Sequence, residues 1–477
     1  MLLTSWPLII YDEILMINPA IFQAYDIRGL YPQDINEENI ATVIKAICQL
    51  FTEKLKKSDL TIVLGRDMRL SSPTLTDVAR KTLLELGVTV VDIGLASTPT
   101  VYFAVCHYDY DAGIQISASH NPKNWNGIKF LYREGNKVTK ISRDTGMEEV
   151  KNFALKNQFN FPEKQGKLIE KNVLKDEVDF AYQLVNPKIK KFKVVVDPAN
   201  AMGAPYLEEI FKRLDSELVK MNFELDGRFP AHEANPLKFS LLKPLQDKVI
   251  EEKADFGIAT DGDGDRIFFI DEKGQVVPAT LISALVAREI LKKKKGEKIL
   301  VDIRYTRNTV KVVKDYGGEP VINVIGHALI TKHLNAVGGA FSGESSGHFF
   351  FRETGGAESA VRIIYYVMDA ISKYEKPLSK IAAELHSSFE SSEFNFKLPK
   401  GTSNKEFIDK ILVGYKDGEI SWMDGLSVDY PEWRFNIRAS NTEPLIRLNL
   451  EANSETLMNE RLTEVKDKIL ALGAHPD

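Results

Sequence analysis

Three aspartates at alternate positions, Asp261, Asp263 and Asp265, are the residues whose spacing most clearly predicts chemistry in this chain. Only glycines separate them, and glycine lets a backbone turn tightly enough for neighbouring carboxylates to converge. The preceding apolar residues, Ala254 to Thr260, predict a short buried strand, so the aspartates begin a loop at its end. Three clustered negative charges repel one another, which makes a cation their natural partner. Oxygen ligands favour Mg²⁺ or Ca²⁺ over softer metals.

Two other interpretations of the acidic run are weaker. A solvated acidic turn is not usually followed at once by Arg266 and an apolar strand such as Ile267 to Ile270. An EF-hand calcium loop would have Glu272 at its twelfth position, but it requires glycine where Arg266 stands. The residues therefore favour a magnesium site used together with a phosphate group, whose remaining charge Arg266 meets.

A serine loop, Ser117-Ala118-Ser119-His120-Asn121-Pro122, follows a short apolar strand. Pro122 stops regular structure, so Ser119 is displayed on a loop. A hydrolase nucleophile would lie in a G-x-S-x-G turn, which is absent here. One interpretation is a simple serine or Asx turn before the proline. The other is that Ser119 carries a phosphoryl group that faces the Asp261 cluster, where Mg²⁺ would neutralise charge during transfer.

Two later loops are suited to sugars and phosphates. In Gly343 to His348, the glycines permit a ligand to approach the backbone, and Glu344 and Ser346 are able to hold vicinal sugar hydroxyls. In Arg438 to Pro444, with Arg447 beyond it, a guanidinium and three short polar side chains are able to surround a phosphate. A polar turn and a helix cap are the respective alternatives.

The start of the chain has one further candidate. Arg28, in Tyr25-Asp26-Ile27-Arg28-Gly29, is either an anion contact or a partner for Asp26, and spacing alone does not decide between them. Residues 1–15 are apolar but lack a basic start and a small-residue cleavage site, so a signal peptide is not expected. We expect them to lie outside the fold, with Met16 as an alternative translation start.

The elements that must position these loops alternate between strands and helices. This alternation predicts three consecutive α/β domains with mixed, largely parallel sheets, whose strands direct their carboxyl ends toward the ligand. Shorter strands and a single final helix, 455–472, predict an α+β domain at the end. The other predicted strands are 61–65, 88–94, 112–117, 192–197, 218–223, 255–259, 298–304 and 321–325, and the other predicted helices are 74–86, 98–107, 206–214, 242–253, 280–293, 309–316 and 329–335.

Candidate seams divide the chain at a polar stretch near 156–167, a turn at 271–275 and the segment 385–393. The expected order is an N-terminal extension and then four domains, because 477 residues are too many for one core. The expected bounds are 1–15 for the extension, 16–162 for the domain with the serine loop and 163–273 for the domain with the metal-binding loop. The domain with the sugar-binding loop is expected at 274–388, and the domain with the phosphate-binding loop at 389–477.

Composition excludes several classes of protein. The chain is 44% hydrophobic and 27% charged, which is typical of a soluble globular protein. A net charge of -5 provides no general attraction for nucleic acid or an anionic membrane, so any phosphate site must be built locally. No apolar run is long enough to span a bilayer. The two cysteines, Cys48 and Cys106, have no metal-binding spacing, which suits free thiols in the cytoplasm.

Together the four loops resemble those of the α-D-phosphohexomutases, within them the bacterial and archaeal phosphomannomutase/phosphoglucomutase group. The resemblance extends from about Ile21 to Ala452 and includes the motifs at 65–67, 226–230 and 325–327. It implies a heart-shaped enzyme of four domains around a central cleft, which interconverts hexose 1-phosphates and 6-phosphates. It also implies Mg²⁺ as cofactor, hexose 1,6-bisphosphate as activator and sugar phosphates as partners, with no nucleic acid or membrane partner. Oligomeric state stays undecided.

The resemblance also assigns roles to individual residues. Ser119 corresponds to the phosphoserine, which shares Mg²⁺ with Asp261, Asp263 and Asp265. Arg266 would approach the transferring group, Lys129 and His348 match positions proposed for proton transfer, and His120, Arg28 and Tyr25 line the same pocket. The remaining matches, to residues that contact the sugar or its non-reacting phosphate, are Arg304, His327, Glu344, Ser346, Arg438, Ser440, Asn441, Thr442 and Arg447.

Some positions depart from the family pattern. Ser345 stands where mannose and glucose enzymes usually have methionine and glucosamine enzymes glutamine. Residues 355–358 replace an acidic pair and glycine, and Arg304 replaces a common lysine. Phosphomannomutase/phosphoglucomutase activity is therefore the leading expectation and phosphoglucosamine mutase activity the alternative. A metal-dependent phosphatase and a non-catalytic sugar-phosphate sensor are the rivals from other classes.

Overall fold

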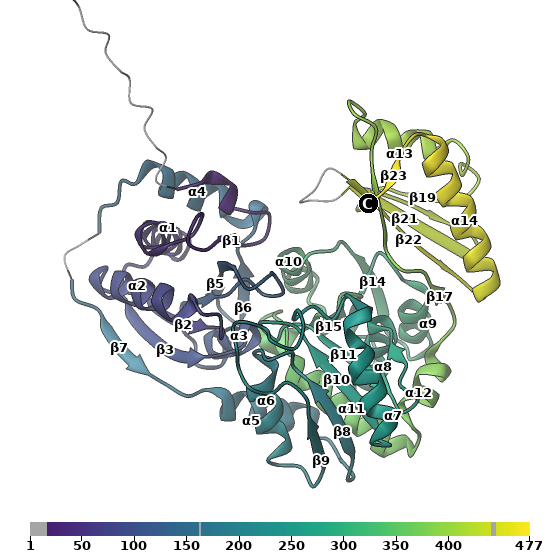
Figure 1. Cartoon of the computed structure of the whole chain (residues 1–477), viewed down its shortest axis with the longest axis horizontal. Coiled ribbons are helices and arrows are strands. Elements are labelled where there is room, and N and C mark those ends of the chain that lie inside the picture. Colours follow the sequence, from purple (N-terminus) through teal and green to yellow (C-terminus); the bar gives the residue numbers. More distant parts are fainter. Residues whose placement is uncertain (1–16, 162–163, 440–444) are drawn as a thin grey trace, which may run out of the picture.

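The chain forms four β-sheets in succession, each accompanied by the helices of the same stretch of sequence (Figure 1). The computed structural model describes residues 17–161, 164–439 and 445–477. Each of the first three sheets mixes parallel and antiparallel pairs, whereas the fourth is antiparallel throughout its described pairs. The predicted class is confirmed: three α/β domains precede an α+β domain.

The first sheet has the order β1-β5-β4-β2-β3-β7, with β6 beside β5. Its parallel strands β4, β2 and β3 direct their carboxyl ends toward the same edge, where the serine loop begins. The elements are η1 Pro19–Ile21, β1 Ile27–Leu30, α1 Glu37–Leu55, β2 Thr61–Arg66, α2 Ser72–Glu85, β3 Thr89–Leu95, α3 Thr98–His107, β4 Ala112–Ile116, β5 Trp125–Glu134, β6 Lys137–Lys140, η2 Arg143–Thr145, α4 Met147–Lys156 and β7 Lys167–Glu170.

The second and third sheets have the orders β12-β11-β10-β8-β9 and β14-β13-β15-β16. A single hydrophobic core extends through both, from Phe256 and Phe269 to Phe341 and Tyr365, so these two domains form one body. The elements are α5 Leu174–Val185, β8 Lys193–Asp197, α6 Gly203–Phe211, β9 Glu217–Lys220, η3 Phe239–Leu242, α7 Lys243–Glu251, β10 Phe256–Thr260, β11 Ile267–Asp271, β12 Val276–Val277, α8 Ala279–Lys293, β13 Lys298–Asp302, α9 Arg307–Asp315, β14 Glu319–Asn323, α10 His327–Val337, β15 Phe341–Gly343, β16 Phe349–Phe351, η4 Arg352–Thr354, α11 Ala360–Tyr374 and α12 Leu378–Leu385.

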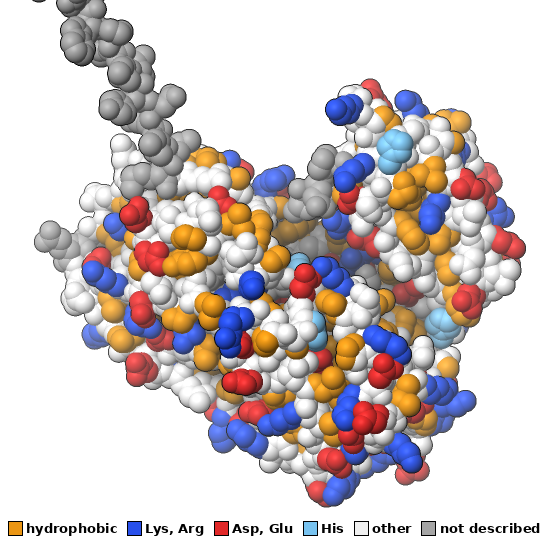
Figure 2. All heavy atoms as spheres, viewed as in Figure 1, with side chains coloured by type: hydrophobic (Ala, Val, Ile, Leu, Met, Phe, Trp, Pro, Cys, Tyr) orange, Lys and Arg blue, Asp and Glu red, His pale blue; other side chains and the backbone are white. Residues whose placement is uncertain are grey.

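The fourth sheet has a hydrophobic core of its own, built around Phe407, Phe435 and Leu448. The molecule is hollowed between this domain and the first, with Lys and Arg side chains beside the hollow (Figure 2). The elements are β17 Phe389–Glu390, β18 Phe394–Lys397, α13 Asn404–Leu412, β19 Glu419–Ser421, β20 Leu426–Asp429, β21 Trp433–Ala439, β22 Leu445–Ala452, α14 Glu455–Ala471 and β23 His475–Pro476.

Several elements differ from the sequence-based expectations. Strands β1, β5 and β6 were not predicted. The sequence of β5 lacks the apolar pattern expected of a strand, because Asn126 and Lys129 within it are polar although both are buried. In its described part the fourth domain has a second helix, α13, besides the one that was predicted. Ser403 stabilises the start of α13, because its side chain accepts a hydrogen bond from the backbone N–H of Glu406. The strand expected at 218–223 ends early, at Lys220, as β9.

The hydrogen-bonded sheets divide the chain slightly differently from the predicted domain bounds. β7 lies beyond residue 163, yet it pairs with β3 of the first sheet. β12 lies beyond residue 274, yet it pairs with β11 of the second sheet. The bounds themselves stay predictions. Within the described segments, no helix combines the length and apolarity that crossing a bilayer would require.

Candidate active site

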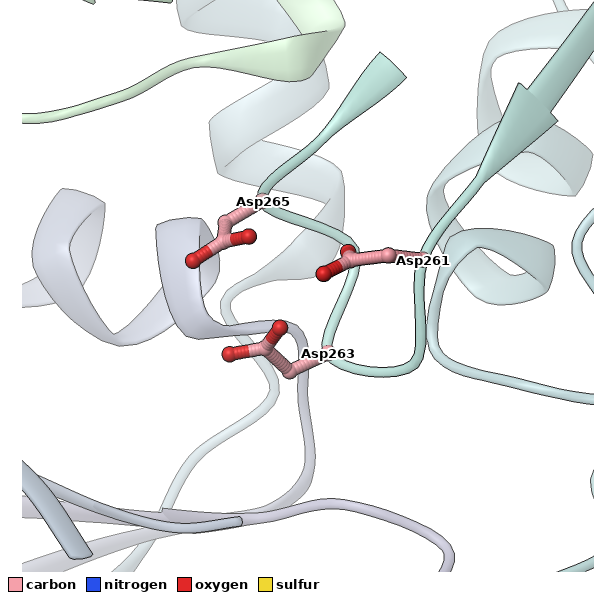
Figure 3. Close-up of side chains that lie close together, drawn as sticks. All are labelled: Asp261, Asp263 and Asp265. Carbon is pink, nitrogen blue, oxygen red and sulfur yellow. The ribbon is translucent and has the colours of Figure 1, made fainter. Parts of the chain in front are cut away.

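The three aspartates lie on the tight turn between β10 and β11, and their side chains point toward one another (Figure 3). One carboxylate oxygen from each lies within 4.8 Å of the others. Gly264 has a φ of 72°, which a glycine adopts without strain. Gly262 is required by packing, because a Cβ there would lie 2.2 Å from the carbonyl oxygen of Ser119. The metal-binding loop and the serine loop are therefore in direct contact.

Ser119 faces the acidic cluster, as the sequence predicted. Its Oγ lies 3.1 Å from Oδ2 of Asp261 and 3.2 Å from Nδ1 of His120, and the residue is buried. Its φ of 51° is in the left-handed region, which a residue other than glycine adopts only with some backbone strain. Burial, and after it the nearby cation of Arg266, lowers the pKa of His120 far below its usual value, so this ring is neutral.

Arg69 holds the serine loop in this conformation, and sequence reasoning missed it. Its buried guanidinium donates to the carbonyl oxygens of Ser119, Asn121 and Pro122 at 2.8, 2.6 and 2.7 Å. Asp67 pairs with it at 3.1 Å. The signal in the sequence was an aspartate and an arginine two residues apart at the end of β2, where charged residues begin a turn.

Lys129, on β5, lies against the aspartates from the side of the first domain. Its Nζ is 2.6 Å from Oδ2 of Asp263 and 2.6 Å from Oδ2 of Asp265. Burial alone would lower the pKa of this lysine, but the two carboxylates outweigh it and raise the pKa, so the side chain is cationic. Thr98, at the start of α3, adds a hydrogen bond of 2.5 Å from Oγ1 to Asp263.

The acidic cluster fits a hard divalent cation. Burial, and after it the neighbouring Asp265 and Asp263, raises the pKa of Asp261 far above its usual value, so a cation beside it would stabilise its charged form. Within the described chain, Oδ1 of Asp263 is buried and has no hydrogen-bond partner. An unsatisfied carboxylate oxygen among converging oxygen donors is the environment that Mg²⁺ prefers.

The third domain contributes His348, from the turn between β15 and β16. Its Nε2 lies 3.2 Å from Oδ1 of Asp265, and its Nδ1 lies 3.0 Å from Oε2 of Glu344. Burial would lower its pKa, but these two carboxylates raise the pKa to about 9. Nε of Arg266 lies 3.4 Å from Nε2 of the same ring. The structure thus brings the predicted residues Arg266 and His348 together at the acidic cluster.

Glu344 and Arg304 form an ion pair of 3.1 Å beside His348. Asp302, at the end of β13, pairs with Arg304 at 2.7 Å and also accepts a hydrogen bond from the backbone N–H of Ser345. Ser346 Oγ lies 2.8 Å from Nδ1 of His348. Asp302 is a second residue that sequence reasoning missed, because nothing in its spacing links it to a loop forty residues later.

Two predicted residues lie where the first and third domains meet. His327 begins α10, and its ring centroid is 5.6 Å from that of Tyr25. The ring is buried, which lowers its pKa far below the usual value. Lys140 of β6 and Glu358 form a buried ion pair across the same junction, which shows that one residue of the atypical segment 355–358 joins the two domains.

Arg28 is an ion-pair partner for Asp26, at 2.7 Å, so the second of the two alternatives for this residue is confirmed. Its Nη1 also donates to Oδ1 of Asn121 at 2.6 Å, which places the guanidinium against the serine loop. The anion contact, which was the first alternative, stays a prediction.

In the fourth domain, Arg438 and Arg447 share one carboxylate. Nη2 of Arg438 lies 2.7 Å from Oε2 of Glu393, and Nη1 of Arg447 lies 3.5 Å from its Oε1. Glu393 was not recognised in the sequence. The predicted contacts Ser440, Asn441 and Thr442 lie outside the described residues.

Comparison with known proteins defines the chain. Four family models, described as phosphoglucomutase/phosphomannomutase α/β/α domains I, II and III and C-terminal domain, match residues 19–160, 171–274, 280–389 and 395–468. Phosphomannomutases of Vibrio cholerae and Methanocaldococcus jannaschii are 36% and 33% identical, over 94% and 95% of this chain and 98% of each relative. A phosphoglucomutase/phosphomannomutase family protein of Burkholderia thailandensis superimposes with a TM-score of 0.85 at 29% identity, over 97% of this chain and all of that one.

The fold and its acidic junction are those of an enzyme that interconverts phosphohexoses, a phosphohexomutase. The chain belongs to the phosphoglucomutase/phosphomannomutase family, within the α-D-phosphohexomutases. The predicted family and enzyme class are confirmed. The predicted role of each site residue is not tested by these comparisons. Mutases of this family depend on magnesium, and the buried aspartates form a site that could hold it.

Proposed function

We propose that this enzyme moves a phosphoryl group between the 1- and 6-positions of mannose or glucose phosphates through a phosphorylated Ser119. The observation that supports this most directly is the contact of Ser119 Oγ with Asp261, 3.1 Å apart and buried at the junction of three domains. The phosphomannomutases that match nearly the whole chain support the choice of sugars. With two free cysteines, we place the protein in the cytoplasm.

In the first half of the reaction, a free sugar hydroxyl attacks the phosphorus of phospho-Ser119. A new P–O bond to the sugar forms, the P–O bond to Ser119 Oγ breaks, and the hydroxyl proton leaves as the serine oxygen gains one. Lys129 and His348, which both contact the aspartates, are the side chains proposed to exchange these protons. When held by Asp261, Asp263 and Asp265, Mg²⁺ supplies positive charge that offsets the charge on the transferring group.

The product of this half is a hexose 1,6-bisphosphate, which turns over in the cleft before the second transfer. Its other phosphate then goes back to Ser119, so the serine ends phosphorylated and the sugar phosphate is isomerised. A clamp that accepts either end of the sugar is needed. We assign this clamp to Arg438 and Arg447, with Ser440, Asn441 and Thr442. Hexose 1,6-bisphosphate would act as activator by phosphorylating any unmodified enzyme.

The sugar ring would lie against the loop of the third domain. Glu344 and Ser346 have their polar atoms within reach of His348, and Arg304 holds Glu344 in place. His327 and Tyr25 close the junction with the first domain. Arg266, beside His348, and Arg28, beside Asn121, would meet the reacting phosphate, and His120 would fill the space next to Ser119.

The alternative substrate is a glucosamine phosphate. Ser345 is neither the methionine usual in the mannose and glucose enzymes nor the glutamine of the glucosamine enzymes, so this loop does not choose between the sugars; its backbone N–H donates to Asp302. A panel of mannose, glucose and glucosamine phosphates, each with and without hexose 1,6-bisphosphate, tests the proposal. A wide preference for glucosamine 1-phosphate would contradict it, and phosphate release equal to isomer formation would instead indicate a phosphatase.

A further inference from the structure

A second pocket lies next to the metal-binding loop but shares no residue with the site described above. It has a volume of about 510 Å³ and opens at the carboxyl end of β3, between the first and second domains. Its walls come from the ends of β2, β3 and β7, the segment after β7, Arg80 of α2, and the first turns of α3, α5 and α6. This volume is typical of sites for small metabolites.

Two cations in this pocket lack an acidic partner. Among the residues described, neither Arg66 nor Lys171 has a carboxylate within ion-pair distance; Arg66 donates only to the backbone oxygen of Asp67, at 3.3 Å, and Lys171 lies over the ring of Tyr108. The third cation, Arg80, is already paired with Asp92 at 2.7 Å. The pocket therefore has two basic side chains that no carboxylate of the described chain neutralises, and that of Lys171 has to leave the ring of Tyr108 to meet a ligand's negative charge.

The helix starts strengthen this preference for an anion. The N-terminal turns of α3, α5 and α6 border the pocket, and the N–H groups of such turns carry partial positive charge. The start of α6 has no side-chain cap, whereas Ser97 accepts from the backbone N–H of Thr100 in α3 and Asn172 accepts from that of Leu174 in α5, so α6 offers the free N–H groups. The one carboxylate of the pocket without an ion-pair partner in the described chain, Glu170, is exposed.

The pocket wall is in direct contact with the metal-binding loop. The Tyr206 hydroxyl donates to the carbonyl oxygen of Gly264 at 3.4 Å, and a Cβ at Gly264 would lie 3.2 Å from Cβ of Ser97. The next residue of α3, Thr98, donates from its backbone N–H to the carbonyl oxygen of Asp263 at 2.9 Å. A ligand that shifts the start of α3 or α6 must therefore shift the loop that carries the aspartates.

We propose that this pocket binds a small phosphomonoester as an effector of the mutase, with Arg66 and Lys171 on the phosphate. Arginine matches the geometry of a phosphate group, and the pocket is larger than inorganic phosphate alone requires. The effect of the ligand on turnover passes through the metal-binding loop, so that part rests on the proposed magnesium site. Binding in the pocket does not depend on it.

The first experiment tests binding alone. Crystals of the enzyme are soaked with glucose 6-phosphate or, separately, with inorganic phosphate, and density is sought within hydrogen-bond distance of Arg66 and Lys171. We expect the sugar phosphate in the pocket of the wild type and not in Arg66→Gln, with inorganic phosphate bound more weakly. Density only at the acidic junction, or equal density in the variant, would overturn the proposal.

The second experiment tests the effector role with substrate saturating at the active site. We expect added glycerol 3-phosphate, a phosphomonoester that a hexose mutase cannot isomerise, to change kcat at least twofold, with the concentration for half effect rising about 10-fold or more in Lys171→Gln, as for loss of one charged hydrogen bond. Lys175→Gln, four residues further along and paired with Asp179 on the surface, is the matched control and should behave as wild type. A response that persists unchanged in Lys171→Gln would refute the effector role. If isomerase activity itself were absent, the soak would still decide whether the pocket binds.

Discussion

The acidic junction and the fourth domain are built in opposite ways. At the junction, side chains from three domains contact one another directly: Lys129 and Ser119 from the first, the aspartates from the second, and His348 from the third. In the fourth domain, Arg438 and Arg447 share a carboxylate of their own domain, that of Glu393. From this difference we propose that the residues of the chemistry are held on a fixed body, while the proposed clamp is on a domain joined to it less tightly.

The cores explain why one part is fixed. The second and third domains share one hydrophobic core, so moving one against the other would expose buried apolar surface. The fourth domain has a separate core. It meets the third domain through polar contacts: Arg434 donates to the carbonyl oxygen of Ile303 at 2.7 Å, and the backbone N–H of Thr306 donates to Glu451 at 2.6 Å. A rotation of the fourth domain would break hydrogen bonds between the two domains, but it would not expose the apolar residues of either domain's core.

The largest effect is expected for Ser119→Ala. Without the hydroxyl no phosphoserine forms, so kcat should fall by about 10⁴-fold or more while binding of sugar phosphate changes little. Steady-state kinetics measures kcat, and calorimetric titration measures the binding of sugar phosphate. Mass spectrometry of the intact protein shows whether the phosphate is missing. Ser372→Ala, on α11, is the control. Equal losses in binding and turnover would contradict the assignment.

Removal of the metal should come next. Chelation of the wild type should abolish turnover and added Mg²⁺ should restore it, whereas Asp263→Asn should lose about 10²- to 10³-fold in kcat and respond poorly to Mg²⁺. Mg²⁺ titration of the activity measures this. Asp263→Asn also breaks the ion pair between Asp263 and Lys129. Lys129→Met breaks that ion pair but keeps the carboxylate of Asp263, so it separates loss of the ion pair from loss of the metal ligand. If chelation left kcat unchanged, the proposed role of Mg²⁺ in catalysis would be wrong.

Arg438→Gln tests the other half of the comparison. Loss of one charged hydrogen bond to the non-reacting phosphate should raise KM about 10- to 100-fold and leave kcat within a few-fold. Arg461→Gln, a change at a half-buried residue of the same domain whose side chain pairs with Glu464, should have no effect on KM or kcat. If kcat fell as strongly as in Ser119→Ala, the division between chemistry and clamp would be wrong.

The smallest effect on turnover is expected for Glu177→Gln, within the fixed body. Burial raises the pKa of Glu177 to about 7, and Thr100 donates to it at 2.7 Å. A carboxyl whose folded pKa is raised is protonated in the native state, so stability falls as pH rises from the unfolded value of about 4.5 through 7. The variant should lose this slope, worth about 3 kcal/mol at most.

Urea unfolding of wild type and variant at pH 5 and pH 8 measures that slope, and kcat should stay within about twofold of the wild type. Glu149→Gln, an exposed change on α4, is the control. An identical pH dependence in variant and wild type would show that Glu177 is not protonated in the native state. A large loss of kcat would show that the fixed body transmits changes at this position to the chemistry.

Most of the framework was predictable from local pattern. The parallel strands of the first three sheets are short apolar runs between helical segments, and periodicity identifies them. β5 was missed because Asn126 and Lys129 interrupt its pattern, and both are buried for contacts made by the folded protein. The second helix of the fourth domain was missed although Ser403 and Glu406 form a recognisable cap.

The sequence by itself determined which groups take part: closely spaced aspartates, a displayed serine, and arginines on separate loops, because their chemistry and spacing are local properties. Only the tertiary structure decided how they pair. Arg69 fastens the serine loop, Asp302 orients Arg304, and Lys129 lies between two aspartates more than 130 residues away. Such contacts join distant loops through the packing of whole domains, so no local pattern of residues contains them.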